Sequence, residues 1–374
     1  MAKHATRCGK SIGRCCRSVE RRRRGWTDAP PIRYAGPMSD ALNALFHPFA
    51  KGLLPRPQPG RGVFLRAEGP LDPDWRNALL CEQSFKPAHE ALRRDGCTVV
   101  PTFEGDGYDL GLCLLTKHKT ETLANLGRAW AALRPGGVLV CAGGNDVGAG
   151  SIERALKTAI DGVSSLSKSH CKVFWAERGD TIPPALAAWA EAGQMQQGTE
   201  TGCWSRPGLY NWNKVDAGSA LLVEHLPADL TGRVADLGAG WGYLSLALLA
   251  RAPKIASLDL FEAEWHAVEA ARANLAHSSA SARLGFHWHD VAAGLPTAAF
   301  DWVVMNPPFH QGKATDIDLG RAFITNAAAA LAPGGRLLFV ANRQLPYEPV
   351  VAAHFRRQTT LAETGLYKVI EARI

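Results

Sequence analysis

The sequence lacks the cysteine patterns that a disulfide framework or a zinc site requires. Its nine cysteines contain no C-x-x-C pair and belong to no His/Cys cluster of zinc-finger spacing. Cys97, Cys113 and Cys141 lie among valine, leucine and glycine, as small buried residues do. We therefore expect reduced thiols in a cytoplasmic protein, with no structural metal.

Long apolar runs are also missing. No stretch approaches the ~18 consecutive apolar residues that a membrane helix needs. A content of 46% hydrophobic and 21% charged residues is typical of a globular protein, and 374 residues leave room for two domains of ordinary size. We expect no membrane partner.

Positive charge is scarce outside an N-terminal head, residues 1–37. The head holds ten Lys or Arg against two acidic residues, a net charge of +8, so the rest of the chain sums to −1. Affinity of that remainder for nucleic acid must therefore come from local patches. We expect the head to be a disordered basic tail. The alternatives are an organelle transit segment, which fits less well, and a translation start at Met38.

The same series of elements is predicted in both halves of the chain: a strand, a loop, a helix that stops at Pro-Gly-Gly, and a strand. In the first half these elements are expected at Tyr108–Leu115, Thr120–Leu133 and Val138–Ala142. In the second half they are expected at Phe300–Met305, Leu319–Leu331 and Arg336–Ala341. We interpret the echo as two doubly wound α/β domains related by duplication, at residues 38–200 and 201–374.

A glycine-rich turn in the second half indicates a nucleoside ligand. Asp236, Gly238 and Gly240 belong to a D-x-G-x-G-x-G pattern between a predicted strand and a predicted helix. Glycine lets the backbone turn tightly and approach a ligand. The pattern lacks the Gly-Lys-Ser/Thr of a phosphate-binding loop, does not distinguish a dinucleotide from another adenosine ligand, and also occurs in plain strand-to-helix turns.

Acidic residues end the next two predicted strands. Glu262 lies twenty residues after Gly242, where a carboxylate can bind both hydroxyls of a ribose. Asp259 competes for that role but lies inside the apolar run. Asp290 follows the strand expected at Leu284–His289 and could accept a hydrogen bond from an adenine amino group.

The most specific motif is Asn306-Pro307-Pro308-Phe309, directly after the strand expected at Phe300–Met305. Proline cannot continue a central strand, so this strand must end in a rigid loop at its carboxyl edge, where α/β sheets bind ligands. The Asn306 Oδ1 atom and the Pro307 carbonyl would form two fixed acceptors for an exocyclic amino group. The Phe309 ring would stack on its base. His310 is expected to shape the base pocket. A surface turn is the alternative.

Residues 201–374 resemble class I S-adenosylmethionine-dependent methyltransferases, and most closely the bacterial small-subunit (16S) rRNA guanine-N2 methyltransferases. The resemblance to the large-subunit (23S) enzymes is nearly as close. The matching stretches are Arg206-Pro-Gly-Leu-Tyr, Asp216-Ala-Gly-Ser, Asp236-Leu-Gly-Ala-Gly-Trp-Gly, Asn306-Pro-Pro-Phe-His-Gln, Val340-Ala-Asn-Arg-Gln-Leu-Pro-Tyr and Thr364-Gly-Leu-Tyr-Lys-Val. The family usually has Asp-Val-Gly-Ser where this chain has Asp216-Ala-Gly-Ser, a mild change in a helix cap expected at Asp216.

The resemblance implies a Rossmann-like methyltransferase fold in tandem, with an N-terminal copy that has lost cofactor binding and helps to hold RNA. It implies S-adenosylmethionine at Gly238, Gly240, Glu262 and Asp290, with the target guanine held by residues 306–309. In the first half, Lys117 and Lys119 occupy the loop where the second half has Asn-Pro-Pro-Phe. Two lysines there would bind phosphate groups of RNA. The alternative is that they belong to a solvated loop.

These observations predict an enzyme that methylates the exocyclic N2 of a guanine in ribosomal RNA, free or in the assembling small subunit. Asn306, Pro307 and Phe309 are the predicted catalytic residues, with Pro308, His310, Lys117 and Lys119 as substrate contacts. The alternatives are a 23S rRNA enzyme, an N-methyltransferase for DNA adenine or protein glutamine, and a non-enzymatic RNA-binding assembly factor.

Overall fold

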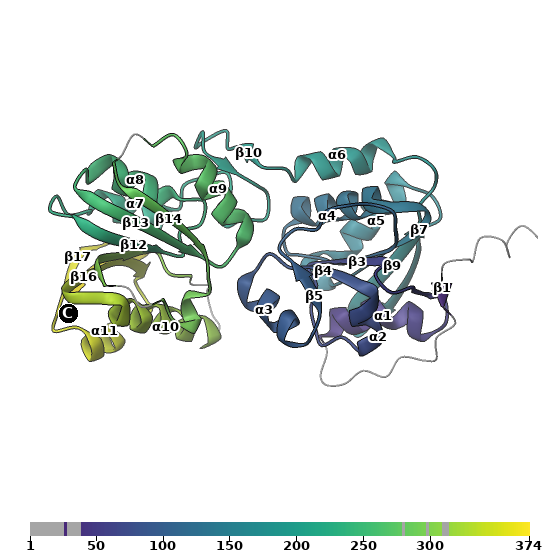
Figure 1. Cartoon of the computed structure of the whole chain (residues 1–374), viewed down its shortest axis with the longest axis horizontal. Helices are drawn as coiled ribbons and strands as arrows, with labels where there is room; N and C mark the ends of the chain where they lie inside the picture. Colours follow the sequence, from purple (N-terminus) through teal and green to yellow (C-terminus); the bar gives the residue numbers. More distant parts are fainter. Residues whose placement is uncertain (1–25, 28–38, 279–280, 297–298, 309–313) are drawn as a thin grey trace, which may run out of the picture. The chain divides into compact units, whose positions relative to one another are not determined.

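Two seven-stranded sheets with the same strand order form the centre of the chain (Figure 1). The computed structural model describes residues 26–27, 39–278, 281–296, 299–308 and 314–374, with backbone alone at 26–27 and 314–316. The chain divides into two compact units, Met1–Glu82 with Leu92–Ala190, and Gln83–Ala91 with Glu191–Ile374. The short segment Gln83–Ala91 therefore belongs to the second unit.

The sheet of the first unit has the order β5-β4-β3-β6-β7-β9-β8. Its strands are β3 (Gly62–Leu65), β4 (Leu79–Glu82), β5 (Thr98–Val100), β6 (Tyr108–Leu114), β7 (Leu133–Gly144), β8 (Ser164–Lys168) and β9 (Cys171–Glu177). The helices of this part of the chain are α1 (Asp40–Ala50), α2 (Pro73–Ala78), α3 (Lys86–Arg94), α4 (Lys119–Ala132), α5 (Ala149–Ala159) and α6 (Pro184–Ala192). The head contributes β1 (Trp26–Thr27), which pairs with β2 (Arg56–Pro57).

The sheet of the second unit has the order β14-β13-β12-β15-β16-β18-β17. Its strands are β12 (Gly232–Leu237), β13 (Ile255–Glu262), β14 (Arg283–Trp288), β15 (Phe300–Met305), β16 (Leu331–Asn342), β17 (Arg357–Glu363) and β18 (Tyr367–Arg373). The helices are α7 (Ala217–Glu224), α8 (Tyr243–Arg251), α9 (Trp265–Leu275), α10 (Ala314–Ala330) and α11 (Glu348–His354). A hairpin of β10 (Gln196–Gln197) and β11 (Trp204–Ser205) precedes them.

Strand by strand, the two sheets correspond. In each sheet the first five strands in this order are parallel, and the next strand, β9 or β18, is antiparallel to its neighbour. The predicted fold class, two Rossmann-like methyltransferase domains in tandem, is confirmed. The strand predicted at Phe300–Met305 is also confirmed as β15.

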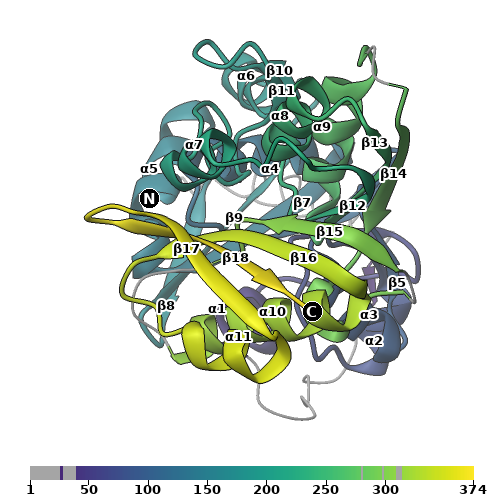
Figure 2. The same cartoon turned by 90° about the vertical axis from the view of Figure 1, so that its left-hand side faces the viewer.

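Both faces of the second sheet are covered by helices, as Figure 2 shows. Trp302 and Val304 of β15 pack towards the layer of α7, α8 and α9, whereas Val303 and Met305 pack towards α10 and α11. A strand buried on both faces reads as a continuous apolar run. This burial explains why the strand at Phe300–Met305 could be predicted from the sequence.

The Pro-Gly-Gly segments differ from the prediction. They were expected to separate helix from strand, but β7 already begins at Leu133 and β16 at Leu331. Both segments lie within the strands and coincide with a register shift against the neighbouring strand. Gly136 and Gly334 share a φ of +77° there, a backbone conformation that favours glycine. Both copies thus keep the same irregularity.

Candidate active site

The glycine-rich turn joins β12 to α8 with three glycines in the left-handed region, Gly238 (φ +72°), Gly240 (+54°) and Gly242 (+93°). A Cβ added at Gly242 would lie 3.0 Å from Leu275 of α9, so this glycine permits close helix packing. A Cβ at Gly240 would meet nothing within 4 Å. The turn therefore leaves open space beside Gly240, as a ligand cradle requires.

Glu262 ties this turn to the end of β13. Its carboxylate accepts hydrogen bonds from the Gly240 N–H at 2.8 Å and from the Glu264 N–H at 2.9 Å. Desolvation raises the pKa of Glu262, although these backbone donors oppose the shift. The residue predicted to bind a ribose thus lies beside Gly240 at the carboxyl edge of the sheet.

The other acidic residues have distinct surroundings. Asp236 is fully buried, and its Oδ2 accepts from the Ser245 hydroxyl at 2.7 Å. Its Oδ1 is buried without a hydrogen-bond partner among the described residues. Burial raises the pKa of Asp236 to about 7. Asp290 accepts from the Ala292 N–H at 3.0 Å, at the start of a short 3-10 helix.

Asp259, the competitor of Glu262, already has a partner within the sheet. It lies 2.8 Å from Nε2 of His287 on β14, and the His287 ring stacks on Phe261 with centroids 4.4 Å apart. This pairing gives His287 a structural environment. Among the described residues, no group of three His, Cys, Asp or Glu is placed to hold a metal ion.

Asn306 directly follows β15 and is held by its amide nitrogen. Nδ2 donates to Oδ2 of Asp216 and to Oγ of Ser219, both at 2.8 Å. Its Oδ1 is buried and has no partner among the described residues. Pro307 is buried and Pro308 partly exposed, while Phe309 and His310 lie outside the described residues.

The turn and the Asn306 loop lie next to each other. Their strands β12 and β15 pair in parallel, with Leu237 opposite Met305. A Cβ at Gly238 would come within 3.9 Å of the Asn306 carbonyl oxygen. A ligand over the turn would therefore lie beside a molecule bound at Asn306, an arrangement suited to group transfer.

Sequence reasoning missed the residues that hold Asn306. The helix cap expected at Asp216 is confirmed, because its Oδ2 accepts from the Ser219 N–H at 2.8 Å at the start of α7. The Asp-Ala-Gly-Ser stretch was the available signal. It indicates a cap, but no local pattern links it to a residue ninety positions later.

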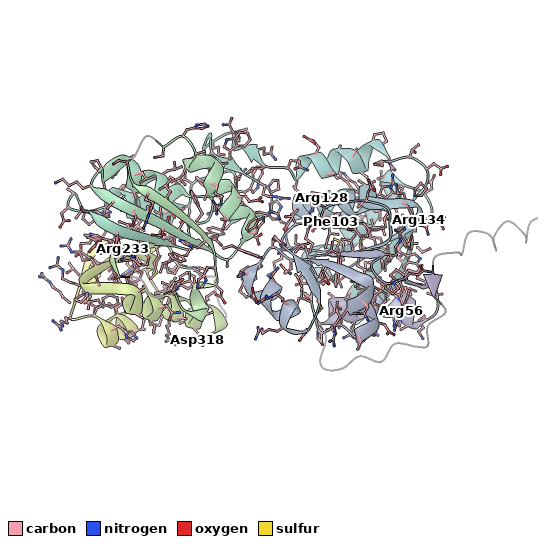
Figure 3. All side chains as sticks on the ribbon, viewed as in Figure 1. Arg56, Phe103, Arg128, Arg134, Arg233 and Asp318 are labelled. Atoms are coloured by element: carbon pink, nitrogen blue, oxygen red, sulfur yellow. The ribbon has the colours of Figure 1, made fainter. Side chains whose placement is uncertain are left out.

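The first unit has a different arrangement at the corresponding position. Glu82 ends β4, the counterpart of β13, and is buried. Its carboxylate receives two hydrogen bonds from Arg128, at 2.9 and 2.6 Å, and one from the Phe103 N–H at 2.8 Å. Figure 3 labels Arg128 and Phe103, and the guanidinium lies 4.9 Å from the ring centroid. One side chain and one backbone N–H of this unit thus bind the carboxylate.

The two predicted substrate lysines of the first unit lie at its sheet edge. Lys117 and Lys119 are exposed, after β6 and at the start of α4. His118 between them caps that helix by accepting from the Glu121 N–H at 3.4 Å.

Among the described helices, none is long and apolar enough to span a membrane.

Known proteins resemble the chain over both units. Residues 200–371 match the family described as "Methyltransferase small domain". The ribosomal RNA small subunit methyltransferase C of Shewanella halifaxensis is 32% identical over 243 residues, 63% of this chain and 69% of the relative. The protein of that name from Shewanella sp. (strain MR-4) is 31% identical over 268 residues, 71% and 77% of the two chains.

Among solved structures, the T. thermophilus 16S rRNA N2 G1207 methyltransferase, in complex with AdoMet and guanosine, matches with a TM-score of 0.70 and 27% identity. The match covers 84% of this chain and 88% of that one. These likenesses extend beyond the second unit, to the tandem arrangement itself. The chain belongs to the family of the ribosomal RNA small subunit methyltransferases C.

Proposed function

We propose that this protein is an enzyme that transfers a methyl group from S-adenosylmethionine to the exocyclic N2 of a guanine in 16S ribosomal RNA. The observation that carries the proposal is the pairing of two features at one sheet edge. An open glycine turn lies beside Asn306, and the Asn306 Oδ1 is an acceptor without a partner among the described residues.

The second unit fits S-adenosylmethionine. Gly238 and Gly240 would let the cofactor approach the backbone, Glu262 would bind its ribose hydroxyls, and Asp290 its adenine amino group. The buried Asp236 Oδ1 has no hydrogen-bond partner among the described residues. Asp236 lies at the end of β12, directly before the turn, where this oxygen would orient the cofactor or a water. The cofactor would supply the methyl group from a positively charged sulfonium centre. Methyl transfer moves this charge to the accepting nitrogen, which can then lose its proton without a strong base.

Residues at the carboxyl edge of the second unit's sheet would hold the target base. Asn306 Oδ1 and the Pro307 carbonyl would accept the two hydrogens of the guanine amino group and orient its nitrogen towards the methyl donor. Phe309 would stack on the base, while Pro308 and His310 would shape its pocket. A base taken from a duplex must first be flipped out, at a cost of a few kcal/mol.

The N-terminal domain predicted from the sequence, residues 38–200, would support RNA binding without binding cofactor. Arg128 binds both oxygens of Glu82, so a ribose would have to compete with this ion pair for the carboxylate. Exposed Lys117 and Lys119 would contact phosphates, which position RNA without reading its sequence. We place the protein in the cytoplasm, acting on the assembling small subunit.

A methyl-transfer assay tests this proposal, because it shows which molecule receives the methyl group. Small subunits, large subunits, DNA and total protein from a strain lacking the gene are incubated separately with the protein and labelled S-adenosylmethionine. The 16S rRNA of the small subunits is then digested and analysed for N2-methylguanosine. The guanine corresponding to the target named for the T. thermophilus enzyme is the first position to map. Label in 23S rRNA, DNA or protein would identify one of the other enzymes. No transfer to any of these, together with no binding of S-adenosylmethionine, would support an assembly factor.

A further inference from the structure

Asp216 is arranged to fix the orientation of the Asn306 amide. An amide side chain can present either its oxygen or its NH₂ group to a substrate, and the two orientations have nearly the same shape. An ionised carboxylate has no hydrogen to donate, so it can only accept hydrogen bonds. With Asp216 Oδ2 beside the amide, the orientation with Nδ2 against Asp216 is favourable, whereas the reverse places two oxygens in contact.

Asp216 is itself held from both sides. Its Oδ2 accepts from the Ser219 N–H, and its Oδ1 accepts from the Tyr210 hydroxyl and from Asn211 Nδ2, each at 3.0 Å. Desolvation and the nearby Asp216 charge raise the pKa of Tyr210 to about 12, so the hydroxyl stays protonated and can donate. The carboxylate therefore has several donors on both oxygens and cannot rotate freely.

The backbone leaves room for this contact. A Cβ at Gly218 would lie 3.1 Å from Asp216 Oδ2 and 3.1 Å from the Tyr367 ring. Glycine at this position in the first turn of α7 keeps that oxygen accessible. Asn306 Nδ2 is thus saturated by Asp216 and Ser219, and Oδ1 is the atom left for a substrate.

We propose that Asp216 is a positioning residue for methyl transfer, which holds the Asn306 side chain so that its oxygen, and not its nitrogen, faces the target amino group. This inference rests on the proposed function of Asn306. In the reverse orientation two NH₂ groups would oppose each other, and the amino nitrogen would lose its fixed direction. Asp216 would therefore affect the rate of the bound complex more than the binding of either reactant.

The first test separates this role from the helix cap. Asp216→Ser keeps a favourable cap residue for α7 but is too short to reach Asn306. The kcat should fall by about 10²-fold, with small changes in the KM for RNA and in the Kd for S-adenosylmethionine. Ser219→Ala is the matched variant, which leaves Asp216 in place and should lose far less. A kcat for Asp216→Ser within about threefold of the wild-type value would overturn the proposal.

A reciprocal exchange tests the orientation itself. Asn306→Asp alone places two carboxylates together and should be nearly inactive. Adding Asp216→Asn restores one donor and one acceptor between the two positions and leaves an oxygen for the substrate. The double variant should recover at least about tenfold over Asn306→Asp, a non-additive result expected of contacting residues. Activities that multiply independently would contradict the pairing.

A measurement without turnover keeps this inference distinct from the proposed function. The side-chain amide protons of Asn306, observed by ¹⁵N NMR, should exchange slowly in the wild-type protein and rapidly in Asp216→Ser. If the wild-type protein transfers no methyl group, the proposed function fails even when this difference is found. If the exchange rates are equal in both proteins, the role of Asp216 fails even when the enzyme is active.

Discussion

The Arg128 guanidinium binds both oxygens of Glu82, at 2.9 and 2.6 Å, at the strand end that Glu262 occupies in the second sheet. In the second unit the corresponding carboxylate is bound by backbone N–H groups of Gly240 and Glu264. One scaffold thus carries the same residue type twice, once with a side-chain cation that saturates it and once beside an open glycine turn.

Arg128→Ala should destabilise the first unit without creating a cofactor site. Glu82 is 3% exposed, and removing its partner leaves a buried charge unpaired, which typically costs about 3–5 kcal/mol. The free energy of unfolding in urea measures this loss, with exposed Arg154→Ala as the control. Calorimetry should give one bound S-adenosylmethionine per chain for both variants. Two bound molecules for Arg128→Ala would show that the arginine alone had closed a second site.

The double replacement Glu82→Gln with Arg128→Met tests the same pair from the other direction. Removing both charges avoids an unpaired ion, so most of the loss seen for Arg128→Ala should be recovered. An additive loss would mean that the two side chains act separately.

Gly240→Ala and Gly242→Ala should have different effects. Both positions have positive φ, so each alanine carries backbone strain of about 1–2 kcal/mol. At Gly242 the new Cβ also meets Leu275, and the midpoint of thermal unfolding should fall further. At Gly240 the Cβ enters open space beside Glu262, so the Kd for S-adenosylmethionine should rise more than for Gly242→Ala. Equal changes in Kd would contradict a ligand at Gly240.

The buried Asp236 should make stability depend on pH. Its pKa is raised to about 7, whereas an unfolded aspartate titrates near pH ~3.9. Between these values the folded chain binds more protons than the unfolded chain. The contribution of this group to stability therefore falls as pH rises through that window, by at most about 1.4 kcal/mol per pH unit.

Asp236→Asn removes this titration, while the new amide oxygen can still accept from Ser245. The stability of the variant relative to the wild-type protein should increase between about pH 4 and about pH 7 and level off above that range. Urea unfolding at several pH values checks this. A difference that does not change with pH would show that Asp236 titrates normally in the folded chain.

The sequence predicted the second unit better than the first. The apolar run before Asn306, the glycine turn and Glu262 are local signals, because each lies within one strand and its following loop. The saturation of Glu82 by Arg128 joins residues 46 positions apart, and the contact of Asp216 with Asn306 joins residues 90 positions apart. Such pairings depend on the order of strands in the sheet, which no local periodicity contains.

The register shifts at Pro-Gly-Gly illustrate a second limit. Proline and glycine after a helix read as a loop in the sequence. In both sheets, however, residues on either side of the shift pair with the neighbouring strand, so the strand begins before the proline. Boundaries therefore depended on tertiary pairing even where the element itself was predicted.

The most direct measurement of the central claim compares the wild-type protein with Asn306→Ala. Both are given labelled S-adenosylmethionine and small subunits from a strain lacking the gene, and their Kd for the cofactor is measured in parallel. Our account predicts N2-methylguanosine in 16S rRNA with the wild-type protein, and a rate at least about 10²-fold lower with Asn306→Ala at nearly unchanged cofactor affinity. Transfer at the wild-type rate by Asn306→Ala, or a loss explained entirely by weaker cofactor binding, would contradict it.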